Sequence, residues 1–151
     1  MAAHTASTPT IMVHSANWGR VTTRCGVTLR MRVRSAAPQA ACVLLDVTLP
    51  PFWDGCALHW HARTTEVIYV LNGTLAYTLN DTTTTASDGT ALLILSGVVH
   101  TIWNPTAMPA TYFAWFAPAH SPAPWPMLAT LSATNEVLLT HPDSNDGLQP
   151  R

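Results

Sequence analysis

The stretch HWHARTTEVIYVLNG, residues 59–73, contains the features on which the fold depends. His59 and His61 are two positions apart, so on a β-strand both imidazoles point to the same face. Glu66 follows after a short corner and opens an apolar run rich in β-branched residues, which predicts the next strand. That run ends in an Asn-Gly pair, which favours a tight hairpin because both central residues of a type I′ turn adopt positive φ. The stretch therefore predicts a β-hairpin with metal-binding types of side chain at its start.

Short apolar runs separated by turn residues continue on both sides of this hairpin. The run at 26–34 alternates strictly, which predicts a half-buried strand with arginines on its wet face. Its expected inward residues are Val27, Leu29, Met31 and Val33. The predicted strands are 26–34, 41–49, 66–71, 74–79, 82–86, 91–95, 100–103 and 111–117. Short strands at even spacing, with no helical period between them, predict an all-β sandwich or barrel.

The composition limits the classes of protein that the chain can belong to. With 151 residues, 48% hydrophobic and 10% charged, it fits one domain with a core and is not a disordered chain. The net charge of −1 provides no electrostatic footprint for nucleic acid, and no apolar run approaches the roughly 18 residues of a membrane span. The N-terminus lacks a secretory pattern and the three cysteines form no even framework, so we expect a cytoplasmic protein with cysteines buried as small apolar groups.

A third histidine joins the first two. His100 begins the strand predicted at 100–103, just after a Ser-Gly turn. Imidazole and carboxylate ligands suit first-row transition metals, and three histidines with one glutamate leave open positions in an octahedral site. His59, His61, Glu66 and His100 together therefore indicate a metal site that can also accept water, dioxygen or substrate.

Two motifs in this arrangement resemble those of the cupin family. The first is HxH, four residues, Glu66, six residues and Gly73. The second lies in 89–104 and includes Ser96-Gly97, His100 and Asn104 at matching spacings. The resemblance implies an all-β cupin double-stranded β-helix, a jelly-roll-like barrel with irregular N- and C-terminal extensions. We expect an N-terminal arm at 1–20, the barrel at 21–120, and a Pro-rich extension and tail at 121–151.

The same resemblance assigns roles to individual residues. It implies one divalent metal (Fe, Ni, Mn, Co or Zn) on His59, His61, Glu66 and His100, with Glu66 also as the catalytic base. Trp53 replaces a glycine usual in the family, and we expect it in the substrate pocket with Ile68 and Ile102. Asn104 is expected to cap a turn, and Leu95 replaces a proline of the second motif without touching a ligand. The seven expected ligand and pocket residues are, in chain order, Trp53, His59, His61, Glu66, Ile68, His100 and Ile102.

Three functions fit a small cupin of this kind. One is a metal-dependent dioxygenase, similar to quercetinase-like cupins, in which Glu66 takes a proton from an enolisable or aromatic small-molecule substrate. Another is a non-redox enzyme similar to polyketide cyclases or isomerases, and the third is a small-molecule-binding module without turnover. Sugar-phosphate isomerases are disfavoured because Lys is absent, and dimethylsulfoniopropionate lyases because Ile68 stands where they carry Tyr. We expect a homodimer formed through the N-terminal strands, which would cover edge strands and apolar surface.

Overall fold

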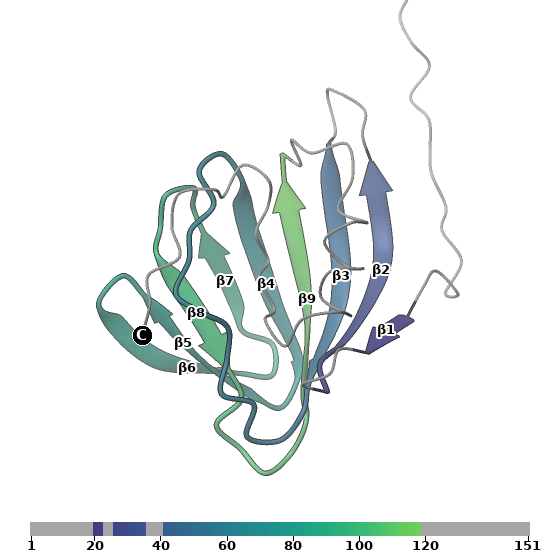
Figure 1. The fold of residues 1–151 in the computed structure, drawn as a ribbon, viewed down its shortest axis with the longest axis vertical. Coiled ribbons are helices and arrows are strands. Elements are labelled where there is room, and N and C mark those ends of the chain that lie inside the picture. Colours follow the sequence, from purple (N-terminus) through teal and green to yellow (C-terminus); the bar gives the residue numbers. More distant parts are fainter. Residues whose placement is uncertain (1–19, 23–25, 36–40, 119–151) are drawn as a thin grey trace, which may run out of the picture.

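The structure is a computed structural model that describes residues 20–22, 26–35 and 41–118. Every regular element in these ranges is a β-strand (Figure 1). The strands are β1 (Arg20–Thr22), β2 (Thr28–Ser35), β3 (Cys42–Leu49), β4 (Thr65–Asn72), β5 (Thr74–Leu79), β6 (Thr82–Ser87), β7 (Ala91–Ile94), β8 (His100–Trp103) and β9 (Ala110–Ala117). Within those ranges no helix has the length and apolar character needed to cross a membrane.

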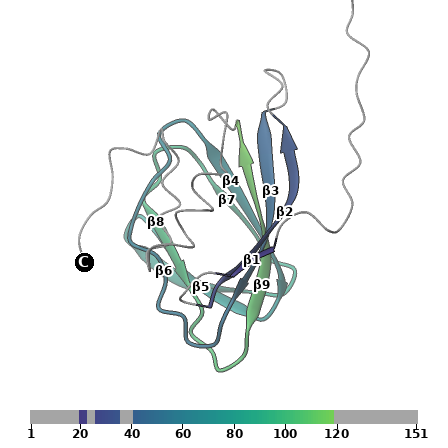
Figure 2. The ribbon, with the colours of Figure 1, turned by 45° about the vertical axis from the view of Figure 1, so that its right-hand side comes forward.

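The strands form two antiparallel sheets. One sheet has six strands in the order β1-β2-β3-β9-β4-β7, and the other has three in the order β6-β5-β8. Figure 2 shows the smaller sheet standing opposite the larger one, so that their inner faces enclose the core. Strand β9, the last of the described strands, lies between β3 and β4 in the middle of the large sheet. The expected all-β jelly-roll architecture is confirmed.

The core follows the period of the strands. Strand β3 alternates half-buried and buried residues along its whole length, as a strand with one covered face must. Leu49, Ile68 and Leu75 are among the largest side chains that are fully buried. The Thr-rich strand β6 lies at the edge of the small sheet with most of its residues exposed, in agreement with the prediction from the sequence.

One expectation about β2 is wrong. Val27, Leu29 and Met31 are buried as predicted, but the pairing of β2 with β3 shifts between Met31 and Val33. This β-bulge pairs Val33 with Leu44, which belongs to the outer face of β3. Because a shift of one residue moves every later side chain to the other face, Val33 leaves the core. Strand β1 was also not anticipated.

The remaining expectations about domain limits concern the ends of the chain. The strands described here run from Arg20 to Ala117, which corresponds to the barrel expected at 21–120. The arm expected at 1–20, apart from Arg20, and the extension expected at 121–151 lie outside the described residues. The limits of these three segments stay predictions.

Candidate metal centre

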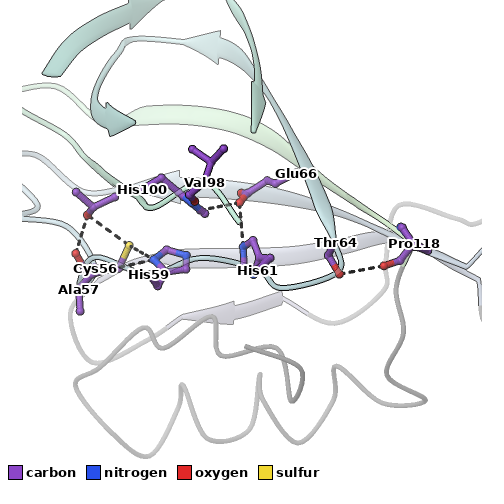
Figure 3. Close-up of polar contacts among 10 residues, drawn as sticks. Cys56, Ala57, His59, His61, Thr64, Glu66, Val98, His100 and Pro118 are labelled. Atoms are coloured by element: carbon purple, nitrogen blue, oxygen red, sulfur yellow. Dashed lines mark hydrogen bonds and ion pairs between the residues drawn. The ribbon is translucent and has the colours of Figure 1, made fainter. Parts of the chain in front are cut away.

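Backbone pairing brings the HxH segment to the start of β8. His59 and His100 form an isolated antiparallel bridge in which each backbone N–H donates to the other's carbonyl, at 3.0 and 2.8 Å. The Gly97 N–H also donates to the His61 carbonyl at 2.9 Å. Figure 3 shows the three histidines and Glu66 gathered on one side of this junction. These few backbone hydrogen bonds thus bring His59 and His61 next to His100, which is distant from both in the sequence.

The short corner between the HxH segment and β4 is also fixed. Thr64 is buried, and its hydroxyl donates to the Pro118 carbonyl at 3.0 Å, just beyond the end of β9 (Figure 3). Two residues later Glu66 enters β4, where it pairs with Phe116 of β9 and Ile94 of β7. The carboxylate therefore projects from the middle of the large sheet toward the histidines.

The three imidazoles form a compact buried cluster. One donor atom from each of His59, His61 and His100 lies within 4.8 Å of the others. The exposed fractions of these residues are 8%, 3% and 1%, respectively. The ring centroids of His59 and His100 are 4.2 Å apart, and that of His61 is 5.2 Å from each of them. Such packing of polar rings away from water is costly unless something satisfies their nitrogens.

Two of the histidines are oriented by the backbone immediately before them. Nδ1 of His59 lies 2.9 Å from the Ala57 carbonyl, and Nδ1 of His100 lies 2.8 Å from the Val98 carbonyl. A carbonyl only accepts, so each Nδ1 carries a hydrogen, and Nε2 is the nitrogen that can bind a metal once it has lost its own proton. A hydrogen bond from one ring nitrogen to a carbonyl is the usual way in which proteins orient an imidazole whose other nitrogen binds a metal.

Glu66 contacts the other side of the cluster. Its Oε2 lies 3.3 Å from Nε2 of His61 and 3.2 Å from Nε2 of His100, and the residue is 2% exposed (Figure 3). Burial alone would raise the pKa of this carboxyl, but hydrogen bonds and charge from His100 and His61 outweigh it and lower the pKa to about 2. Glu66 is therefore an ionised carboxylate in this site.

The cluster fits a metal ion. Nε2 of His59 and Nδ1 of His61 are buried and have no hydrogen-bond partner. Buried polar atoms are rarely left so, and each costs about 1–3 kcal/mol of stability. Three imidazoles beside a carboxylate, each able to bind an ion once its proton is displaced, form the donor set that first-row transition metals prefer. His59, His61 and His100 can therefore hold a metal, and Glu66 is adjacent to it.

Cys56 was expected only as a buried apolar group, but it touches the site. Its Sγ lies 3.8 Å from Nδ1 of His59 and 3.7 Å from the hydroxyl of Thr101, which donates to the Cys56 carbonyl at 2.7 Å (Figure 3). Burial would raise the pKa of the thiol, but His59 and Thr101 lower it. Burial would lower the pKa of His59, but Cys56 raises it to about 9. The spacing of Cys56 three residues before His59 was the only signal available in the sequence.

A small cavity adjoins the cluster. The centre of a water-sized sphere can move through about 20 Å³ of it. Trp53 and Ile102 line it, together with His59, Glu66 and His100. Ile68 is fully buried in the core and is not among the lining residues. Tyr112 and Cys56 also line the cavity, and the sequence did not single them out for it.

Asn104 has the turn-capping role that the sequence suggested. Its amide donates to the carbonyls of Pro50 and Met108 at 2.9 and 2.7 Å. Its oxygen accepts from the backbone N–H and the hydroxyl of Thr106 at 3.0 and 2.9 Å. All four hydrogen-bonding positions are used within the loops, and the Asn104 N–H also donates to the Trp53 carbonyl at 3.0 Å. Asn104 therefore holds the Trp53 loop against the barrel.

Comparisons with known proteins agree with this architecture. The cupin domain family matches residues 45–116. An RmlC-like cupin from Shewanella frigidimarina is similar in structure, with a TM-score of 0.62 and 13% identity, covering 74% of this chain and 95% of that one. A predicted oxalate decarboxylase from Thermotoga maritima has a TM-score of 0.59 and 21% identity over 70% of this chain and 97% of that one. The polyketide cyclase RemF from Streptomyces resistomycificus has a TM-score of 0.57 and 19% identity over 72% and 79% of the two chains. No curated protein matches the chain.

The barrel thus has the fold of the cupins. Residues 45–116 match the cupin domain family, and the motif resemblance seen in the sequence is confirmed. At these levels of identity the structural likenesses establish the fold and leave the reaction to be argued from the site.

Proposed function

We propose that this protein is a metal-dependent enzyme, a dioxygenase acting on a small enolisable or aromatic substrate. The observation that carries the proposal is the buried cluster of His59, His61 and His100, with Nε2 of His59 unpartnered among the described residues and the Glu66 carboxylate beside the cluster. A bound divalent ion would supply a Lewis-acid centre that stabilises an enolate and brings dioxygen alongside. Glu66 is proposed as the fourth ligand and as the base.

Glu66 is the carboxylate placed to act as a base. Its pKa of about 2 depends on hydrogen bonds and charge from His100 and His61. Imidazoles that use these nitrogens as ligands cannot donate the same bonds, whereas a divalent ion would itself favour the ionised carboxylate, so Glu66 would act as a base only when it is released from the ion. It then takes a proton from a carbon next to a substrate carbonyl, while the apolar walls of the cavity exclude water.

Metal analysis of the purified full-length chain tests the first part of the proposal. We expect about one divalent ion per chain, which His61→Ala removes and which His14→Ala, a histidine outside both motifs, leaves in place. Protein that carries no stoichiometric ion, and whose melting temperature does not rise with Fe, Ni, Mn, Co or Zn, would overturn it.

Oxygen uptake with flavonols, diketones and aromatic polyols tests the chemistry. With an identified substrate, Glu66→Gln should retain the fold and lower turnover by about a hundredfold or more, the usual scale for a general base. Turnover without oxygen consumption would replace the dioxygenase with a non-redox cyclase or isomerase, which can use the same carboxylate. Saturable substrate binding without any product would identify a binding module.

We also propose that the protein forms a homodimer, and the outer face of the large sheet supports this. A row of cross-strand neighbours crosses five strands of that face: Val33, Leu44, Trp115, Val67 and Leu93. Trp115 is 47% exposed and Leu93 is 63% exposed. Monomers rarely expose large contiguous apolar patches, so this face, which includes β2 and β3, is the proposed interface.

The cytoplasmic location stays part of the proposal. The three cysteines of the sequence form no even disulfide framework, and Cys56 contacts a proposed metal ligand. Disulfides are rare in a reducing compartment, which supports this location.

A further inference from the structure

The inward face of β9 lines the cavity with a small residue between two aromatic ones. Ala110, Tyr112, Ala114 and Phe116 are all buried, and they alternate along the strand. Phe116 pairs with Glu66, and its ring packs against His61 with centroids 5.7 Å apart and planes at 88°. The metal ligands therefore lie at the level of Phe116, near the end of β9.

Ala114 leaves room between this level and the next aromatic side chain. It pairs with Leu45 of β3 and Ile68 of β4, so the large sheet offers only a methyl group from β9 at this point. The cavity of about 20 Å³ extends past it, and Ala114 and Tyr112 line that cavity together with His59, Glu66 and His100. Tyr112 thus faces the same enclosed space as the proposed ligands, from the opposite side of Ala114.

Among the described residues that line this cavity, Tyr112 carries the only hydroxyl. Burial, and then the negative charges of Glu66 and Cys56, raise the pKa of Tyr112 well above its usual value. The side chain is therefore a neutral donor at any physiological pH. No Arg or Lys is among these described lining residues, so a negatively charged ligand would be met there by uncharged donors, of which the phenol is one and the Trp53 indole N–H is another.

We infer that the Tyr112 hydroxyl donates a hydrogen bond to a compact monoanion, such as a small enolate or carboxylate, that enters the cavity beside the three histidines. This inference rests on the proposed metal function, because an anion enters this apolar space only when a cation is held there. No cationic side chain is among the described residues that line the cavity, which disfavours the higher charge of phosphate esters and dicarboxylates at the same position. Tyr112 is thereby a positioning residue that selects the charge and size of the ligand beside the metal.

Azide binding to the Co(II)-loaded full chain tests the inference without any substrate. Azide is a compact monoanion, and its binding changes the visible absorption of Co(II), so a titration gives its Kd. Tyr112→Phe removes only the hydroxyl and should weaken azide binding by about tenfold or more, the scale of one lost hydrogen bond to a charged group. Tyr77→Phe is the matched control, because Tyr77 packs against the core from β5 and does not line the cavity.

The outcomes separate this inference from the proposed function. Failure to take up Co(II) would overturn both. Normal Co(II) uptake with an unchanged azide Kd in Tyr112→Phe, or with no azide binding by the unmodified protein, would overturn the role of Tyr112 and leave the metal site intact. Equal losses in Tyr112→Phe and Tyr77→Phe would indicate a general packing effect and would also overturn it.

Discussion

Replacing Cys56 with alanine should tighten metal binding near neutral pH, although Cys56 lies next to the proposed ligand His59. The thiol contacts Nδ1 of His59 at 3.8 Å and is a main cause of the raised pKa of that imidazole, about 9. At pH 7 an imidazole with a pKa of about 9 is neutral in only about one molecule in a hundred. A metal must displace that proton before it binds Nε2, so the apparent affinity is reduced by about the same factor.

The expected gain in metal affinity follows from the contacts of His59 that Cys56→Ala leaves in place. Without the sulfur, burial still lowers the pKa of His59, while the Ala57 carbonyl and Glu66 still raise it. A pKa near the ordinary value of 6.5 would leave roughly three quarters of the rings neutral at pH 7. The apparent affinity should then rise by at least about tenfold, and by no more than about a hundredfold.

The pH dependence of metal binding shows independently whether the thiol holds the proton on His59. In the unmodified protein the affinity should rise by about tenfold per pH unit from about 6.5 until it levels off at about 9, because each bound ion releases the His59 proton. In Cys56→Ala that rise should level off near pH 6.5. Competition with a chromophoric chelator for Zn(II) or Co(II) between pH 6 and 9 measures both curves.

Cys42→Ala is the matched control for this experiment. Cys42 is likewise a half-buried cysteine, but it begins β3 on the outer face of the sheet. Its removal should leave both the affinity and its pH dependence unchanged. Weaker metal binding in Cys56→Ala would refute the reasoning and identify the sulfur as a ligand, whereas superimposable pH curves would show that the thiol does not hold the His59 proton.

Three further predictions concern the barrel and its outer face. Gly73→Ala should cost more than about 2 kcal/mol of unfolding free energy, because φ is +88° and a Cβ would lie 2.8 Å from the Pro109 carbonyl oxygen. Gly89→Ala is the control: φ is +80° but nothing lies within 4 Å of the added Cβ, so it should cost about 1 kcal/mol. Equal losses of stability in urea unfolding would contradict the close approach at Gly73. Asn104→Ala should cost about 2–4 kcal/mol by leaving its loop partners unpaired, yet keep full metal stoichiometry; loss of the metal would mean that the loop also forms the site. Trp115→Glu should convert a dimer into a monomer in light scattering, whereas Thr84→Glu on exposed β6 should not, and an unchanged dimer would place the interface elsewhere.

Local patterns were sufficient to predict the strands and the cluster. Eight of the nine strands in the described ranges follow from alternation and turn residues, and β1 was missed because three residues carry too little pattern. The HxH spacing places two rings on one face, and the bridge to His100 needs only neighbouring strands in the expected antiparallel arrangement. Val33 was misplaced because a β-bulge depends on how two strands pair, and the sequence of one strand does not contain that information.

The residues that line the cavity depend on a register between distant segments, which explains why they could not be predicted. Tyr112 and Ala114 reach the site only because β9 inserts between β3 and β4, with Ala114 opposite Ile68 and Phe116 opposite Glu66. A shift of that pairing by two residues would keep every inward residue of β9 inward and preserve the alternation. It would nevertheless place Ala114 beside the histidines in place of Phe116 and move the phenol with it. The metal donors are therefore encoded by short motifs, whereas the selectivity of the space around them is encoded by the strand register.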